Sequence, residues 1–117
     1  MNYSLNKKLI WVAGHNGMVG SATVRRLLSE DCEVITVKKN TLDLRDSSSV
    51  LKWIKNNKPE VIIIAAGKVG GIHANSHYPA EFLYDNLMIE TNIIHSAWQC
   101  GIEKLLFLGS SCIYPRN

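Results

Sequence analysis

Three glycines, spaced three residues apart after an apolar run, constrain the fold of this chain more than any other feature. Residues 9–13 are apolar, Gly14, Gly17 and Gly20 follow them, and the next residues carry apolar side chains with a helical period. Gly14 suits a sharp turn, Gly17 lets the main chain approach a pyrophosphate, and Gly20 lets a helix pack closely. The pattern predicts a strand, a tight turn and a helix that begins near Met18.

The start of this helix is the first candidate binding site. Its free main-chain N–H groups and the positive end of its dipole suit the pyrophosphate of a dinucleotide. Similar glycine spacing also occurs in ordinary turns between a strand and a helix, but here a second strand follows promptly, as in dinucleotide-binding folds. The residues assigned to this part of the cofactor site are Gly14, Asn16, Gly17, Met18, Val19 and Gly20.

Length and composition narrow the function classes. A chain of 117 residues, 46% of them apolar, is expected to form one small domain, shorter than a complete two-half dinucleotide-binding fold. Its net charge is +3, but the basic residues are scattered, so no nucleic-acid partner is expected. Cys32, Cys100 and Cys112 match no metal spacing, and His73 and His77 fall in a predicted loop, so no metal is expected. The cysteine pattern fits the cytoplasm, and the lack of a signal segment or a run of about 20 apolar residues argues against a membrane partner.

Further strands and helices are expected to alternate along the chain. Asp46 or Ser47 is expected to cap the first of two later helices and Pro59 to close it. Such alternation predicts an α/β fold, a Rossmann-type parallel sheet with strand order 3-2-1-4 and helices on both faces. Residues 1–117 would be the N-terminal part of an NAD(P)-binding Rossmann domain, incomplete on its C-terminal side and without a substrate domain. The later strands are predicted at residues 33–37, 61–66 and 104–108, and the later helices at residues 46–58 and 79–100.

Residues after the second predicted strand bear on which dinucleotide binds. NAD-specific versions of the fold place an acidic residue there, about 20 positions after the glycine turn. Lys38 and Lys39 occupy that place here, and their ammonium groups would attract a 2′-phosphate, so NADP is predicted, although paired lysines are also common in loops. Asp43 could accept a hydrogen bond from the adenine amino group or could be a turn residue, and Leu44 is assigned to the same site.

Three segments of the chain resemble one enzyme family. They are residues 14–21, residues 65–72, and residues 105–115, which read Leu-Leu-Phe-Leu-Gly-Ser-Ser-Cys-Ile-Tyr-Pro. Together they resemble the GDP-L-fucose synthase family of the extended short-chain dehydrogenase/reductase superfamily, in register over nearly the whole chain. The resemblance implies an enzyme that takes GDP-4-keto-6-deoxy-D-mannose, inverts C3 and C5, and reduces the C4 ketone with NADPH.

The resemblance also implies roles for individual residues. Ser110 corresponds to the catalytic serine that hydrogen-bonds the C4 oxygen, and Cys112 to the cysteine that transfers protons during epimerisation. Ala65, Ala66 and Lys68 correspond to a loop that passes the cofactor. Without the resemblance, Ser110 would be interpreted as a turn hydroxyl, Cys112 as a small buried residue and Lys68 as a solvated loop lysine.

Two departures from the family pattern limit what the resemblance implies. Asn16 stands where the family commonly has an arginine that holds the 2′-phosphate. The family's Tyr-x-x-x-Lys pair, whose tyrosine is the general acid, is absent after the first predicted strand. Tyr3 and Lys7 have its spacing but precede that strand, so we attribute their match to chance. We therefore expect these 117 residues to bind the cofactor without completing the reaction. The alternatives are part of an NAD-dependent nucleotide-sugar epimerase or dehydratase, or a non-catalytic NADP-binding module.

Self-association is expected on two grounds. A sheet that ended at its fourth strand would leave an apolar edge unpaired. In addition, the long helix at residues 79–100 contributes to a homodimer in the extended members of the superfamily. Asn86 and Asn92 on this helix are interpreted as packing or interface groups.

Overall fold

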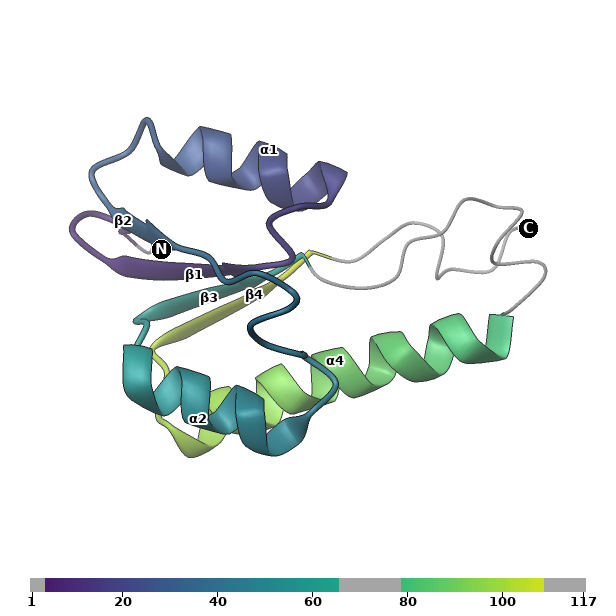
Figure 1. The fold of residues 1–117 in the computed structure, drawn as a ribbon. Coiled ribbons are helices and arrows are strands. Elements are labelled where there is room, and N and C mark those ends of the chain that lie inside the picture. The colour runs from purple at the N-terminus through teal and green to yellow at the C-terminus, as the bar shows by residue number, and fades with distance from the viewer. Residues whose placement is uncertain (1–3, 66–78, 109–117) are drawn as a thin grey trace, which may run out of the picture.

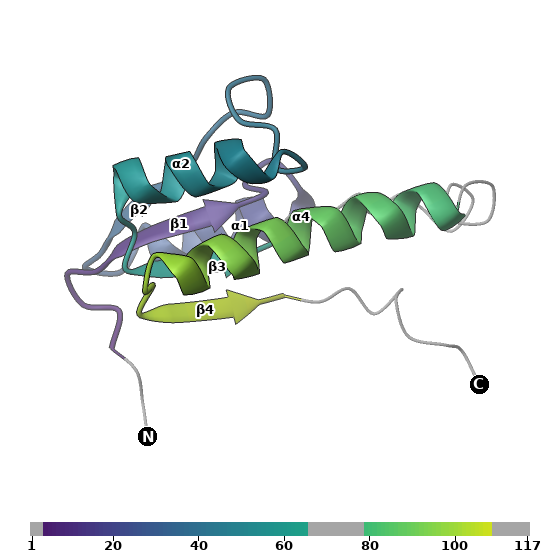
Figure 2. The ribbon, with the colours of Figure 1, turned by 90° about the horizontal axis from the view of Figure 1, so that it is seen from below.

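A four-stranded parallel sheet lies between two layers of helices (Figures 1 and 2). The computed structural model describes residues 4–65 and 79–108. Helix α1 covers one face of the sheet, and helices α2 and α4 cover the other. The predicted α/β class is confirmed. The strands are β1 (Leu9–Ala13), β2 (Glu33–Ile35), β3 (Val61–Ile64) and β4 (Lys104–Phe107), and the helices are α1 (Met18–Leu27), α2 (Ser47–Asn57) and α4 (Pro79–Gln99).

Two apolar clusters hold the helices to the sheet, because alternate residues of a strand point to opposite faces. The cluster on the α2 and α4 side contains Trp11 and Ile62, and the cluster on the α1 side contains Val12 and Ile63. All four residues of β3 are buried, as expected for a central parallel strand covered on both faces. Burial of one such isoleucine stabilises the fold by about 2 kcal/mol.

The strand order is β2-β1-β3-β4, so the predicted order 3-2-1-4 is wrong. Strand β1 pairs with β2 and with β3, and β3 also pairs with β4. The short strand β2 has no fully buried residue and can lie at the edge, whereas the buried strand β3 needs a neighbour on each side. The chain therefore leaves β1 toward β2 on one side and crosses back to β3 on the other. This reversal creates a topological switch point at the carboxyl ends of β1 and β3, where open α/β sheets bind their ligands.

The ends of the elements follow local chemistry, although three predicted strands were too long. In the structure, β2, β3 and β4 end at Ile35, Ile64 and Phe107. Asp46, and not Ser47, is the N-cap of α2, and Ser49 donates a hydrogen bond to its carboxylate. Lys58 and Gly101 adopt positive φ angles of 49° and 67° after the last turns of α2 and α4, as is common where helices end.

Helix α4 has two different faces. Ile93 and Ala97 are buried in the cluster shared with α2. The opposite face is apolar but exposed, and Trp98 leaves 77% of its surface accessible. Strand β4, at the edge of the described sheet, also exposes apolar side chains. The exposed apolar residues of these two elements include Leu83, Leu87, Ile94, Trp98, Leu106 and Phe107.

Candidate functional site

The turn between β1 and α1 requires glycine for more than one reason. Gly14 has a φ angle of 90°, which side chains disfavour, and its carbonyl oxygen accepts a hydrogen bond from the Gly17 N–H at 3.3 Å. A Cβ on Gly20 would lie 1.8 Å from the Gly14 oxygen, so Gly20 is required for the helix to pack against the turn. A Cβ on Gly17 would meet its nearest neighbour at 3.7 Å, an ordinary contact. The protein itself therefore has room for a side chain at Gly17.

The start of α1 is free to receive an anion. Its N-cap is Gly17, no side chain caps it, and its first turn contains no acidic residue. Met18 and Val19 are 88% and 54% exposed. The N–H groups at a helix start and the helix dipole favour a negative group there, and no carboxylate of the first turn already supplies one.

A pocket of ≈ 210 Å³ adjoins the turn at the carboxyl end of β1. It includes residues from β1, from the loop between β2 and α2, from the end of β3 and from α4. Its apolar walls suit a flat ring, and its polar residues carry two positive charges and one negative charge. The apolar lining residues are Trp11, Ala13, Val37, Leu42, Leu44, Ala65 and Ile89, and the others are Gly14, His15, Asn16, Gly17, Lys39, Asp43 and Arg45.

Seven residues assigned to the cofactor site from sequence line this pocket together, namely Gly14, Asn16, Gly17, Lys39, Asp43, Leu44 and Ala65. Lys38 is exposed but does not line it. Met18 and Val19 lie at the start of α1, and Gly20 is buried against the turn. The assigned residues Ala66, Lys68, Ser110 and Cys112 lie outside the described residues, as do His73 and His77.

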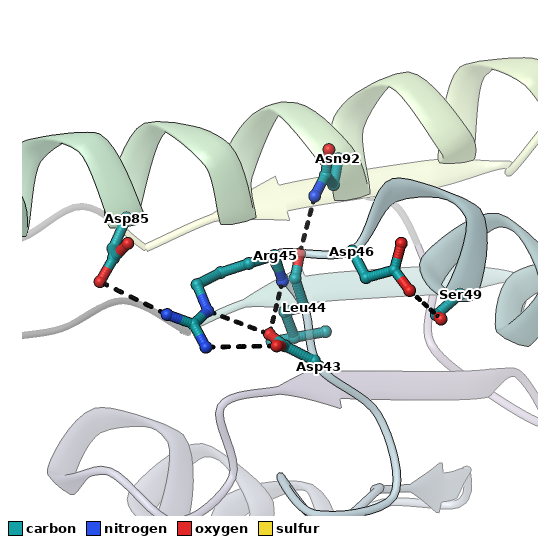
Figure 3. Close-up of polar contacts among 7 residues, drawn as sticks. All are labelled: Asp43, Leu44, Arg45, Asp46, Ser49, Asp85 and Asn92. Atoms are coloured by element: carbon teal, nitrogen blue, oxygen red, sulfur yellow. Dashed lines mark hydrogen bonds and ion pairs between the residues drawn. The ribbon is translucent and has the colours of Figure 1, made fainter.

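Asp43 and Arg45 form the best-defined polar contact in the pocket (Figure 3). Asp43 Oδ1 accepts hydrogen bonds from the main-chain N–H of Arg45 at 3.0 Å and from its Nε at 3.1 Å, and Oδ2 accepts one from Nη2 at 3.2 Å. These bonds lower the pKa of Asp43, and the carboxylate in turn raises the pKa of Arg45. These bonds therefore favour the ionised form of Asp43 and orient its carboxylate, in a pair whose side chains are each about half exposed.

Two contacts tie this loop to α4. Asn92 donates a hydrogen bond from Nδ2 to the Leu44 carbonyl oxygen at 2.9 Å. The Arg45 guanidinium lies between Asp43 and the buried Asp85, with Nη1 3.9 Å from Asp85 Oδ2. The interpretation of Asn92 as a packing group is thus supported by its partner. Because α4 anchors the loop from the side, it contributes to the shape of the pocket.

The pocket residues that were not assigned from the sequence are Trp11, Ala13, His15, Val37, Leu42, Arg45 and Ile89. Arg45 could have been found, since it lies two residues after Asp43 with the opposite charge, a spacing that suits a local ion pair. The apolar residues among them come from three separate parts of the chain, β1, the loop between β2 and α2, and α4, and nothing local in the sequence brings them together.

Two kinds of feature are missing from residues 4–65 and 79–108. No group of three or more His, Cys, Asp or Glu side chains there could hold a metal ion. None of the helices in these two stretches has the length and apolar character to cross a bilayer.

Comparison with known proteins supports the resemblance noted from the sequence. The chain is 56% identical over 114 residues to a GDP-L-fucose synthase of Sinorhizobium fredii, with 97% of this chain and 36% of that protein covered. It is 49% identical to a GDP-L-fucose synthase of Escherichia coli, with 96% of this chain and 35% of that protein covered. A solved structure of the GDP-mannoheptose C4 reductase MlghC from Campylobacter jejuni with NADP bound superposes with a TM-score of 0.85 at 36% identity, covering 97% of this chain and 34% of that one.

The chain spans about a third of the length of these relatives. The resemblance to GDP-L-fucose synthases is confirmed, and a nicotinamide dinucleotide is the class of cofactor that the matches indicate. A family model described as "NAD dependent epimerase/dehydratase family" matches residues 10–117. With nearly all of its residues matched and a parallel sheet that carries the glycine turn, the chain belongs to the NAD dependent epimerase/dehydratase family.

Proposed function

We propose that this chain is the NADP(H)-binding portion of an enzyme that converts GDP-4-keto-6-deoxy-D-mannose to GDP-L-fucose. One observation carries the proposal: the glycine turn, Lys39 and Asp43 border a single pocket at the switch point between β1 and β3, beside the uncapped start of α1. Sequence identity of 49–56% to proteins named GDP-L-fucose synthase supports the choice of reaction.

The residues present fit a reduced NADP cofactor. The open space at Gly17 would admit the pyrophosphate, and the uncapped start of α1 would stabilise its charge. The apolar walls would hold the adenine ring, with Asp43 accepting from its amino group and Lys39 attracting the 2′-phosphate. When bound, NADPH supplies the hydride for ketone reduction. The contribution of these pocket residues is therefore to bind and orient the cofactor.

Two further residues are proposed to act on the sugar, by their correspondence to the family pattern. Ser110 would donate a hydrogen bond to the C4 oxygen as negative charge develops on it. Cys112 would exchange the protons at C3 and C5, which the 4-keto group makes acidic. Both lie outside the described residues, so these two roles rest on sequence correspondence.

Titration of the chain with NADPH and with NADH tests the cofactor choice. We expect tighter binding of NADPH, and we expect Lys39→Ala to weaken NADPH binding by about tenfold, since it removes a cation near the 2′-phosphate, while NADH binding stays the same. Lys52→Ala, an exposed lysine of α2 outside the pocket, is the matched control and should change neither. Equal or tighter binding of NADH would instead favour an NAD-dependent epimerase or dehydratase.

A further inference from the structure

Arg45 uses most of the hydrogen-bonding capacity of Asp43. An ionised carboxylate offers about four acceptor positions. Arg45 fills two of them on Oδ1, through its main-chain N–H and Nε, and one on Oδ2, through Nη2. One acceptor position therefore remains, on Oδ2, and Asp43 lines the pocket.

Contacts with α4 orient Arg45 from two directions. Its main chain belongs to a loop whose preceding residue, Leu44, is held by Asn92, and its guanidinium extends toward the buried Asp85 of α4. The flat guanidinium presents its N–H groups in a rigid fork, so a carboxylate that receives two of them has little rotational freedom. A lysine in the same place would hold Asp43 at one point only.

We propose that Arg45 is a positioning residue that holds the Asp43 carboxylate so that its remaining acceptor on Oδ2 receives the amino group of the adenine ring. This inference rests on the proposed function, because it assumes that an adenine dinucleotide fills the pocket. It goes further in assigning base selectivity to an arginine that does not itself contact the base.

Selectivity for adenine follows from the chemistry of the free position. Adenine carries an amino donor where hypoxanthine carries a carbonyl oxygen. A fixed carboxylate oxygen accepts from the first and repels the second, whereas a carboxylate free to rotate can turn away and bind either base.

The test measures the affinity of the chain for NADPH and for the NADPH analogue with hypoxanthine in place of adenine. The wild-type chain should prefer NADPH by about tenfold or more, the contribution of one hydrogen bond to a charged group. In Arg45→Met the preference should fall below about threefold, because NADPH loses its oriented acceptor and the analogue is no longer repelled. Arg45→Lys should recover little of the preference, because it restores the charge without the fork.

Arg26→Met provides the matched control. Arg26 also forms an ion pair with a carboxylate, at 3.1 Å to Glu30, but on α1 and outside the pocket. This variant should leave both affinities and their ratio unchanged.

Three other results would overturn the inference. If Arg45→Met weakens both ligands equally and Arg45→Lys restores both, Arg45 acts only through its charge or through the fold, and the inference is wrong. A wild-type chain that binds both ligands equally well also overturns it while leaving the proposed function standing. A wild-type chain that binds neither ligand overturns the proposed function and the inference together.

Discussion

Gly17 and Gly20 lie three residues apart, yet the structure gives them different tasks, which substitution can separate. Gly20→Ala brings a Cβ against the Gly14 carbonyl, a backbone atom that cannot move aside, so we expect a loss of at least about 1–3 kcal/mol in the free energy of unfolding. Gly17→Ala meets no such obstacle and should cost about 1 kcal/mol or less as a poorer N-cap. Urea denaturation of the two variants measures both values.

Ligand binding completes this comparison. Gly17→Ala should weaken NADPH binding by about tenfold or more, because its methyl group occupies the approach of the pyrophosphate. A Gly17→Ala chain that unfolds like the wild type and binds NADPH equally well would contradict the assignment of this turn.

The ion pair of Asp43 predicts a particular dependence of stability on pH. Arg45 lowers the Asp43 pKa below its ordinary value of 3.8, so the pair stabilises the folded chain above the pKa of the unfolded state and loses that contribution as the pH falls through the lower folded-state pKa. Asp43→Asn should therefore lower the urea midpoint equally at pH 7 and pH 5, and the difference from the wild type should shrink only below about pH 4.

A double-variant cycle serves as the control for this pH prediction. Asp43→Asn combined with Arg45→Met should cost no more than the larger of the two single substitutions, since the residues share one interaction. A difference that stays the same from pH 7 down to about pH 2 would mean that the pKa of Asp43 is not lowered by folding.

The exposed face of α4 predicts contact between two copies of the chain. At about 100° per residue, its exposed residues Leu83, Leu87, Ile94 and Trp98 fall within about 60° around the helix axis. A contiguous exposed apolar surface of this kind marks a protein–protein contact. We expect concentration-dependent self-association in sedimentation velocity, which Leu87→Glu should suppress.

A matched substitution elsewhere on the surface distinguishes association through this face of α4 from non-specific association. Leu28 is also exposed, but it follows α1 on the opposite face of the sheet. Leu28→Glu should therefore leave the association unchanged. A wild-type chain that sediments as a monomer at every concentration contradicts the prediction.

The sequence predicted the helices and strands better than their arrangement in the sheet. Hydrophobic periodicity and local caps located the strands and helices within a few residues, because both are properties of neighbouring side chains. The strand order depends on which strand is buried on both sides, a comparison across the whole sheet, and β3 was therefore misplaced. The same limit applies to the pocket: Lys39 and Asp43 follow β2 and were found, whereas Trp11 and Ile89 come from distant elements and were not.

Helix α4 lines the pocket with Ile89 and contacts the pocket loop through Asn92 and Asp85, and it presents bulky apolar side chains to solvent on another side. Helix α4 thus borders both the ligand pocket and the exposed surface where a second copy of the chain is expected to bind. If docking of a neighbour shifts the affinity for the small molecule by some factor, thermodynamics requires the small molecule to shift the affinity for the neighbour by that same factor.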